Sequence, residues 1–355
     1  MAAISQAVPP TPRTGWLTGR RLRKLQEAGL GYLFLLPAFG ILIVFQFFPV
    51  FYGFYISLCN WKVTGCYNLM PVRNYVNLDA SNPIAAAIGS LPLGNYFKAF
   101  QDPEMWHSLL VTVTYSAISV PLQLGIALVL AYLLFQNIRG KPVYRVLIFM
   151  PYITSTVASA SVWAFLYSPD KGPINAALHA LGLPAFKWLN ESRGIFEIVG
   201  SAAGVHLPNW AAGPGLALIA IIFYTTWVFV GYDTTIFMAG LGNIPNELYE
   251  AAKIDGASGW QLFRRITIPL LSPTTFFLLI YTVIGTFKAF NHIFVMTPLE
   301  IAGDPTTTTS LLIFRQMFQY NRYGYSAALS FVLFAVILTL TIIQNRVAGR
   351  RVVYS

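Results

Sequence analysis

The chain has 355 residues, of which 56% are hydrophobic and only 10% charged, and its formal net charge is +10. Soluble domains carry about 25% charged residues, so this composition excludes an ordinary soluble globule. The apolar residues collect into long runs instead of alternating with charge, which makes a lipid bilayer the better solvent for them. The positive charge raises the question of a nucleic-acid partner, which the positions of the basic residues answer.

Six apolar runs are long enough to cross a bilayer, which needs roughly 20 residues of helix. They cover about residues 30–58, 108–135, 143–167, 215–241, 270–296 and 326–343. Several contain prolines, which membrane helices tolerate because neighbouring helices and Ser or Thr side chains satisfy the freed carbonyls. Kinks are expected at these prolines, which are Pro37, Pro49, Pro121, Pro151 and Pro273. The sequence therefore predicts an all-α membrane protein with six transmembrane helices.

The basic residues predict how these helices are oriented. If the N-terminus is cytoplasmic, 14 of the 23 Lys and Arg residues lie in inner segments and eight in outer segments, and Lys288 alone falls inside a span. The inner loops are also shorter, so the positive-inside rule predicts a multi-pass membrane protein with both termini cytoplasmic. Topology then accounts for the charge. Membrane lipid is the expected surrounding, and no nucleic acid is expected.

This topology divides the chain into five parts. They are a cytoplasmic N-terminal tail (1–29), a first transmembrane helix (30–58), an extracytoplasmic segment (59–107), a core domain with five transmembrane helices (108–343) and a cytoplasmic C-terminal tail (344–355). Cys59 and Cys66 fall in the extracytoplasmic segment, where a disulfide can form; two free thiols are the alternative. They lack a second Cys or His pair at zinc-ligand spacing, so no metal site is predicted.

The polar stretch Asn243–Pro269 is patterned like two short helices joined by a turn. Pro245 and Glu247 suit the first turn of a helix, because proline lacks only an N–H that is unpaired there and a carboxylate favours the positive helix end. This first helix should end near Gly256. Each piece has about nine residues, and isolated helices shorter than about 12 residues are marginal in water, so the loop needs a partner surface.

The second helix of this loop has its own start and stop signals. Ser258 followed by Gln261 predicts a capping box, and Pro269 should end the helix at the membrane edge. Small and bulky residues alternate along the loop in a way that suits docking into a groove. The alternative is an amphipathic loop that lies on the lipid headgroups beside Arg264 and Arg265.

The same loop resembles the EAA loop of ABC-importer permeases, whose first helix couples to an ATPase. The matching residues are Glu250, Ala251, Ala252, Asp255, Gly256 and Ala257, followed by Ile268-Pro269. Further matches to the carbohydrate branch of this family occur in order at Asn95-Tyr96, Asp102, Trp106, Arg139-Gly140, Met150-Pro151, Gly231-Tyr232, Gly240-Leu241, Lys288 to Asn291, Met296-Thr297 and Gly324 to Ala327. So many spaced matches are more specific than any single motif. The stretches near 66–94 and 187–213 look inserted, and Gly303-Asp304-Pro305 departs from the family's Gly-Gly-Pro.

This resemblance, to the maltose, glycerol-phosphate and multiple-sugar permeases, implies a type I ABC importer permease in the bacterial inner membrane. The implied partners are a second homologous permease, two ATPase subunits and an extracytoplasmic solute-binding protein that delivers a disaccharide, oligosaccharide, glycosylated polyol or glycerol phosphate. The chain contains no phosphate-binding G-x-x-x-x-G-K-[ST] motif, so ATP and Mg²⁺ are expected on the ATPase partners and this subunit is expected to be non-catalytic.

A sugar path across the membrane needs polar groups at mid-membrane, which are costly unless they line a cavity. Gly285, Lys288, Ala289 and His292 are spaced to share one face of the fifth span, with Asn291 alongside. The resemblance places substrate contacts there and at Gly231, Tyr232 and Thr234 of the fourth span. The alternatives are that Lys288 snorkels to the surface and that His292 is simply hydrated at the outer end.

Two other classes of protein remain to be weighed. A secondary transporter driven by an ion gradient would need paired intramembrane carboxylates, and Asp233 is the one clear candidate in the predicted spans. The estimated depths of Asp233 and Lys288 argue against their direct pairing. A membrane enzyme would need an intramembrane constellation of His, Asp and Glu, which the predicted spans do not supply.

Overall fold

The computed structural model describes residues 19–62, 65–76, 82–191, 193–202, 204, 208, 211–297 and 305–349. The chain divides into two units, residues 1–55 and 56–355. Each is described by itself.

The first unit is built from helix. It contains α1 (Gly19–Leu42), a π-helical turn (Ile43–Phe47) and most of α2 (Phe48–Ser57). Over Glu27–Ser57 these elements form an apolar stretch of 31 residues with a mean hydropathy of 2.3, and its most apolar window has no buried residue. This stretch is long enough to span a membrane, in agreement with the predicted span at 30–58.

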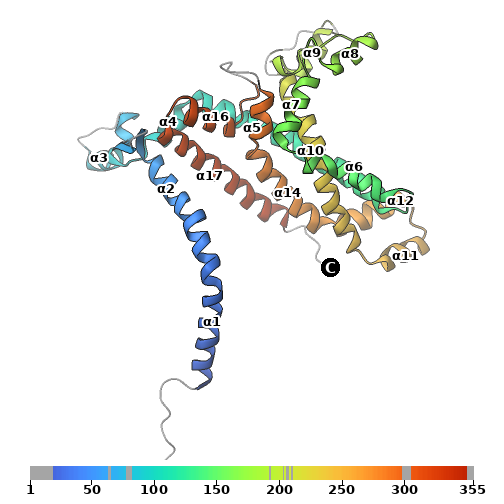
Figure 1. Cartoon of the computed structure of the whole chain (residues 1–355), viewed down its shortest axis with the longest axis horizontal. Coiled ribbons are helices and arrows are strands. Elements are labelled where there is room, and N and C mark those ends of the chain that lie inside the picture. The colour runs from blue at the N-terminus through green and yellow to red at the C-terminus, as the bar shows by residue number, and fades with distance from the viewer. Residues whose placement is uncertain are drawn as a thin grey trace, which may run out of the picture. The chain divides into compact units, whose positions relative to one another are not determined.

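The second unit is organised around long helices that pack side by side (Figure 1). They are α5 (Pro103–Phe135), α10 (Leu216–Gly242), α14 (Ser272–Phe287) and α17 (Tyr323–Val347). α10 packs along α5, and α14 packs against both of them and against α17. Tyr115 of α5 and Ile221 and Tyr224 of α10 are fully buried in the resulting core. Burial here comes from helix-to-helix packing, as expected for a chain whose outer surface faces lipid.

One predicted span, 143–167, is a bent pair of helices. α6 (Lys141–Ile153) and α7 (Thr156–Leu166) meet at 95°. Pro151 has no N–H to donate to the helix, and the Thr154 hydroxyl donates to the Pro151 carbonyl at 2.6 Å, so the hydrogen-bond ladder ends there. The kink expected at Pro151 is confirmed, and it takes the form of a 95° bend between two helices.

A second bend lies at the N-terminal end of the predicted span 270–296. The segment Gly259–Leu270, made of α12 (Gly259–Leu262), a π-helical turn (Phe263–Thr267) and α13 (Ile268–Leu270), meets α14 at 64°. Pro273 lacks the N–H that would continue the ladder across Leu271, so the bend follows from its position. The structure has four uninterrupted helices long and apolar enough to cross a membrane among the described residues, or up to six spans if each bent pair counts as one.

Short elements lie between the long helices. They are the hairpin β1 (Cys59–Lys62) and β2 (Gly65–Leu69), a 3-10 turn (Val72–Asn74), α3 (Pro83–Ser90), α4 (Gly94–Gln101), α8 (Pro173–Ala180), a second 3-10 turn (Trp188–Asn190), α9 (Ile195–Ala202), α11 (Asn246–Ile254), α15 (Asn291–Met296), α16 (Thr309–Phe314) and a π-helical turn (Arg315–Gln319). The strands pair antiparallel with a register shift between Cys59 and Trp61.

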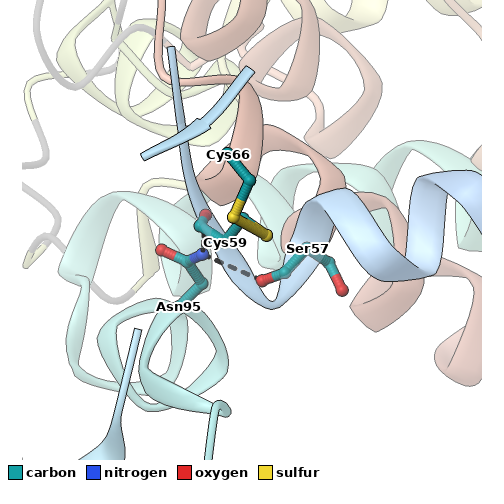
Figure 2. The surroundings of a disulfide bond; sticks show 4 residues. All are labelled: Ser57, Cys59, Cys66 and Asn95. Atoms are coloured by element: carbon teal, nitrogen blue, oxygen red, sulfur yellow. Dashed lines mark hydrogen bonds between the residues drawn. A yellow bond between two sulfur atoms is a disulfide. The ribbon is translucent and has the colours of Figure 1, made fainter. Parts of the chain in front are cut away.

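Cys59 and Cys66 form a disulfide across this hairpin, which decides between the two alternatives left by the sequence (Figure 2). The Asn95 side-chain amide donates to the carbonyls of Ser57 and Cys59 at 2.8 and 3.0 Å. At Gly324, the start of α17, an added Cβ would overlap the Cys59 carbonyl. The backbone that carries the disulfide is thus held by α4 on one side and α17 on the other.

Thiol labelling tests this disulfide directly, because the chain has only two cysteines. We expect no maleimide to react with the denatured, unreduced protein and two maleimides to react after reduction. Cys66→Ser should destabilise the hairpin by about 2–3 kcal/mol, since the bridge closes a short loop. Two reactive thiols before reduction would contradict the pairing.

Candidate functional site

A cavity of about 370 Å³ lies where α5, α10 and the α14–α15 break come together. Six of the predicted substrate-path residues line it: Tyr232, Gly285, Lys288, Ala289, Asn291 and His292. The other two, Gly231 and Thr234, lie on the opposite side of α10, in a groove of about 470 Å³ shared with α6. The structure thus separates the eight predicted residues into two groups.

The helix that carries this part of the cavity is not continuous. α14 ends at Phe287, and α15 restarts at Asn291 after an irregular Phe290 (φ −140°, ψ −60°). The hydroxyl of Ser310 donates to the freed Phe287 carbonyl at 3.0 Å, which satisfies one of the orphan groups at the helix end. The prediction of a single unbroken helix through these four residues is therefore wrong, although all four line the same cavity.

His292 is buried, with 4% of its surface exposed. Its Nε2 lies 3.1 Å from the Tyr115 hydroxyl and 3.2 Å from the Thr225 hydroxyl, and these two hydroxyls are 2.8 Å apart. The interpretation of His292 as a hydrated residue at the outer end is wrong. A three-way polar contact instead joins α5, α10 and α15 beside the cavity.

Asp233 and Gln123 form a second buried polar contact. The Gln123 side-chain amide donates to Asp233 Oδ2, and both residues line the cavity. Asp233 and Lys288 are not joined by an ion pair among the described residues, in agreement with the depth estimate from the sequence. Gln123 and Tyr115 were missed by the sequence reasoning, although the spacing of Tyr115, Ser119 and Gln123 by four marks one polar helix face.

Gly231 marks a close approach between α10 and α6. A Cβ at this position would overlap the Ile148 carbonyl and lie 2.9 Å from the Phe149 Cα. Only glycine lets the two backbones meet so closely, as in other small-residue contacts between membrane helices. The position of Gly231 favours a packing role, whereas Gly285 has nothing within 4 Å of an added Cβ.

The loop after α10 has the helix, turn and helix predicted from the sequence. α11 ends at Ile254, Gly256 has φ +80°, and α12 begins at Gly259. Ser258 and Gln261 make the reciprocal hydrogen bonds of a capping box. Pro269 does not end the second helix, since α13 runs to Leu270 and the bend comes at Leu271.

The six predicted coupling residues all lie on α11 or at its C-terminal turn. Ala252 and Ala257 are half-buried, and Glu250, Ala251, Asp255 and Gly256 are exposed. Apolar side chains nearby are exposed as well: Ile254 by 86% and Trp260 by 67%. The Tyr249 hydroxyl bonds to that of Thr267 at 3.1 Å and ties the two halves of the loop together. The loop therefore exposes an apolar surface, and a hydrogen bond between its two halves holds its shape.

Comparison with known families decides what kind of protein has this architecture. Residues 123–353, which include most of the cavity lining and the whole loop, match the model of the family described as the inner membrane component of binding-protein-dependent transport systems. The chain belongs to this family.

Curated relatives of this transport component extend the similarity over nearly the whole chain. The trehalose/maltose transport system permease MalF of Thermococcus litoralis is 33% identical over 92% of this chain and 96% of its own length. The sn-glycerol-3-phosphate transport system permease UgpA of Rhizobium meliloti is 31% identical over 92% and 96%. The lactose transport system permease LacF of Rhizobium radiobacter is 30% identical over 90% and 94%.

A solved structure shares the fold of this transport component. A chain of the bacterial alginate ABC transporter, in complex with an alginate pentasaccharide-bound periplasmic protein, superposes with a TM-score of 0.69 at 21% identity, covering 93% of this chain and 98% of that one. The predicted fold class, a helical type I ABC permease, is confirmed. The chain is a multi-pass inner-membrane component of a binding-protein-dependent transporter. Membership of this family does not favour the alternative of a secondary transporter driven by an ion gradient.

Proposed function

We propose that this chain is the permease subunit of an ATP-driven importer for a sugar or sugar-like solute: a disaccharide, oligosaccharide, glycosylated polyol or glycerol phosphate. It forms the translocation path with a second homologous permease, receives solute from an extracytoplasmic binding protein and couples to two ATPase subunits. ATP and Mg²⁺ bind to those partners, and this chain carries no cofactor. Three relatives named for trehalose/maltose, lactose and sn-glycerol-3-phosphate transport support the solute class.

The observation that carries the proposal is the exposed loop at α11. A helix of nine residues with no buried residue is too short to be stable alone in water, and its apolar neighbours Ile254 and Trp260 are exposed. Docking into an ATPase groove would stabilise the short helix and bury these apolar side chains. Co-purification of this chain with an ATPase, and hydrolysis stimulated by solute-loaded binding protein, test the proposal; a chain that moves solute alone would refute it.

The cavity supplies what a sugar path requires. Its polar lining includes Asn291 and Lys288, and aromatic faces are provided by Tyr232 and Tyr281, whose ring centroids lie 5.3 Å apart. Sugars bind through hydroxyl hydrogen bonds and through stacking of their apolar faces on such rings. A wall of this composition inside an apolar helix bundle is expected to line a route for a hydrated solute.

Cysteine labelling tests the proposed orientation, which rests on the 14-to-eight distribution of basic residues. Glu247 of α11 and Asn190 are both exposed, so a cysteine at either position should be accessible to a labelling reagent. In intact cells a membrane-impermeant maleimide should label Asn190→Cys and leave Glu247→Cys unlabelled; after permeabilisation and removal of the proposed ATPase subunits it should label both. The reverse pattern in intact cells would overturn the orientation.

Substitution of Lys288→Met tests whether the exposed ammonium contributes to the solute path. The change keeps much of the side chain's length and removes its charge, and Lys288 lies at an irregular break rather than in a packed helix. We expect solute uptake to fall at least about tenfold, because a hydrogen bond to a charged group contributes about 1.5–3 kcal/mol, with normal recovery of the assembled complex. Unchanged uptake over a full concentration range would support snorkelling instead.

A further inference from the structure

Helix α3 turns its large apolar side chains away from the protein. Ile84 is 70% exposed and Ile88 44%, and the C-cap residue Leu91 is 45% exposed. Their spacing of four and three residues places them on one face of the helix. The residues that face the protein are small, since Gly89 is buried and Ala85 is half-buried. A helix on the surface of a soluble domain has the reverse arrangement, so the outward face of α3 needs an apolar environment of its own.

The contacts of α4, which follows α3, place both helices at one surface of the membrane. The membrane-length helices α5 and α17 both begin beside α4. The Lys98 ammonium of α4 lies 4.5 Å from the ring centroid of Tyr325 at the start of α17, and the Tyr325 hydroxyl donates to Asp102, the N-cap of α5. The backbone of residues 70–72 bonds to the end of α3 at 3.0 Å and to the start of α4 at 2.8 Å. α3 is therefore held at the level where two spans begin.

The charges of this segment suit lipid headgroups. Among the described residues from 59 to 101, the charged side chains are those of Lys62, Arg73 and Lys98, and none of these residues carries a carboxylate. α3 has eight residues, which make about 12 Å of helix and cannot cross a bilayer. A short helix with an apolar face and nearby cations is instead stable at the boundary between headgroups and acyl chains, where anionic lipids attract the cations.

The position of α3 favours lipid over a protein that delivers solute. Such a protein must reach the cavity, and no residue of α3 lines that cavity. Figure 1 shows α3 well apart from α7, which packs against α15 in the cavity wall. We propose that α3 is an interfacial anchor, whose Ile84, Ile88 and Leu91 side chains insert between the headgroups and acyl chains of the bilayer. The proposed orientation places the anchor in the outer leaflet, but the inference depends neither on that orientation nor on the solute.

Nitroxide labelling of α3 in the complete transporter tests the anchor. The two native cysteines are paired, so a single added cysteine is the one thiol that reacts without reduction. Ile84→Cys and Ile88→Cys report on the apolar face. Ala86→Cys and Ser90→Cys are the matched controls, because both positions are exposed and each lies about 200° further around the same helix. The labelled complex is reconstituted in vesicles of equal parts phosphatidylethanolamine and phosphatidylglycerol, and the collision rates of the label with oxygen and with a water-soluble nickel chelate are measured.

We expect the ratio of oxygen to nickel collisions to be several times higher at positions 84 and 88 than at 86 and 90. Oxygen dissolves better in acyl chains than in water, whereas the nickel chelate stays in water. Ile88→Asp should lower the ratio at a label on Ile84→Cys to the level of position 86, because a carboxylate is costly among acyl chains. Ser90→Asp should leave that ratio unchanged. If the Ile88→Cys complex does not assemble, Ile84→Cys decides.

Three results would overturn the inference. Equal ratios at all four positions would mean that α3 does not turn its apolar face toward lipid. Low collision rates with both reagents at positions 84 and 88 would place this face against the second permease or another subunit. A fall in both rates when solute-loaded binding protein is added would make α3 a docking site for that protein.

Discussion

Replacing Gly231 with alanine should destabilise the protein strongly, although the change adds only one methyl group. The added Cβ would overlap the Ile148 carbonyl and lie 2.9 Å from the Phe149 Cα. Both are backbone atoms of α6, so no side-chain rotation relieves the contact, and α6 must move away from α10. Overpacking of this kind costs about 1–3 kcal/mol or more. In thermal unfolding of the purified complex we expect the melting temperature to fall by about 5 °C.

Gly285→Ala is the matched control for this measurement of stability. It adds the same methyl group to a membrane helix, but nothing lies within 4 Å of the new Cβ, and alanine favours helix over glycine by about 1 kcal/mol. Its melting temperature should equal or exceed that of the wild type. Equal melting temperatures for Gly231→Ala and the wild type would show that α6 and α10 are not in this close contact in the membrane.

The number and type of the helices could be predicted from the sequence because long apolar runs have few other solutions in a bilayer. The size of the bends could not be predicted, since membrane helices tolerate proline and the hydropathy of a kinked span equals that of a straight one. Pro151 was recognised as a kink site, but the 95° turn depends on the Thr154 hydroxyl and on the packing of α7. The position of Pro151 thus explains why the helix bends, but it does not determine the angle between α6 and α7.

In the candidate site, the loop could be predicted from the sequence, whereas the contacts of the cavity could not. Short-range signals in the loop, such as the Ser258 and Gln261 capping box and the Gly256 turn, were confirmed because they act within a few residues. The cavity depends on helices far apart in sequence, and its partners for His292 are Tyr115 and Thr225. The helical spacing used to group Gly285 with His292 assumed an unbroken helix, which ends at Phe287.

Bulk at the α11 turn should uncouple the transporter without preventing its insertion in the membrane. Ala252 is half-buried near the end of α11, and Gly256 is exposed with nothing within 4 Å of an added Cβ. A tryptophan at either position therefore projects into the space proposed for the ATPase groove. We expect Ala252→Trp and Gly256→Trp to lose at least about fivefold in ATP hydrolysis stimulated by loaded binding protein, since overpacking of an interface costs about 1–3 kcal/mol.

Gly256 combines this effect with a second one, because its φ of +80° is unfavourable for residues with a Cβ. Gly256→Asn separates the two, since asparagine tolerates the left-handed conformation and is much smaller than tryptophan. It should keep most of the coupled hydrolysis. Gly242→Trp is the control for bulk alone: Gly242 ends α10, is exposed, and has nothing within 4 Å of an added Cβ.

The measurements are co-purification of the ATPase subunit and the rate of ATP hydrolysis with and without solute-loaded binding protein. Gly242→Trp and Gly256→Asn should retain the ATPase, and Gly256→Trp should lose it most severely because strain and bulk act on the same turn. The order of the variants in ATPase retention is more informative than the value for any one variant, since general misfolding would affect Gly242→Trp and Gly256→Trp alike. Wild-type assembly and coupled hydrolysis in both Ala252→Trp and Gly256→Trp would instead make the loop a connector on the membrane surface, stabilised by Arg264 and Arg265 at the lipid headgroups.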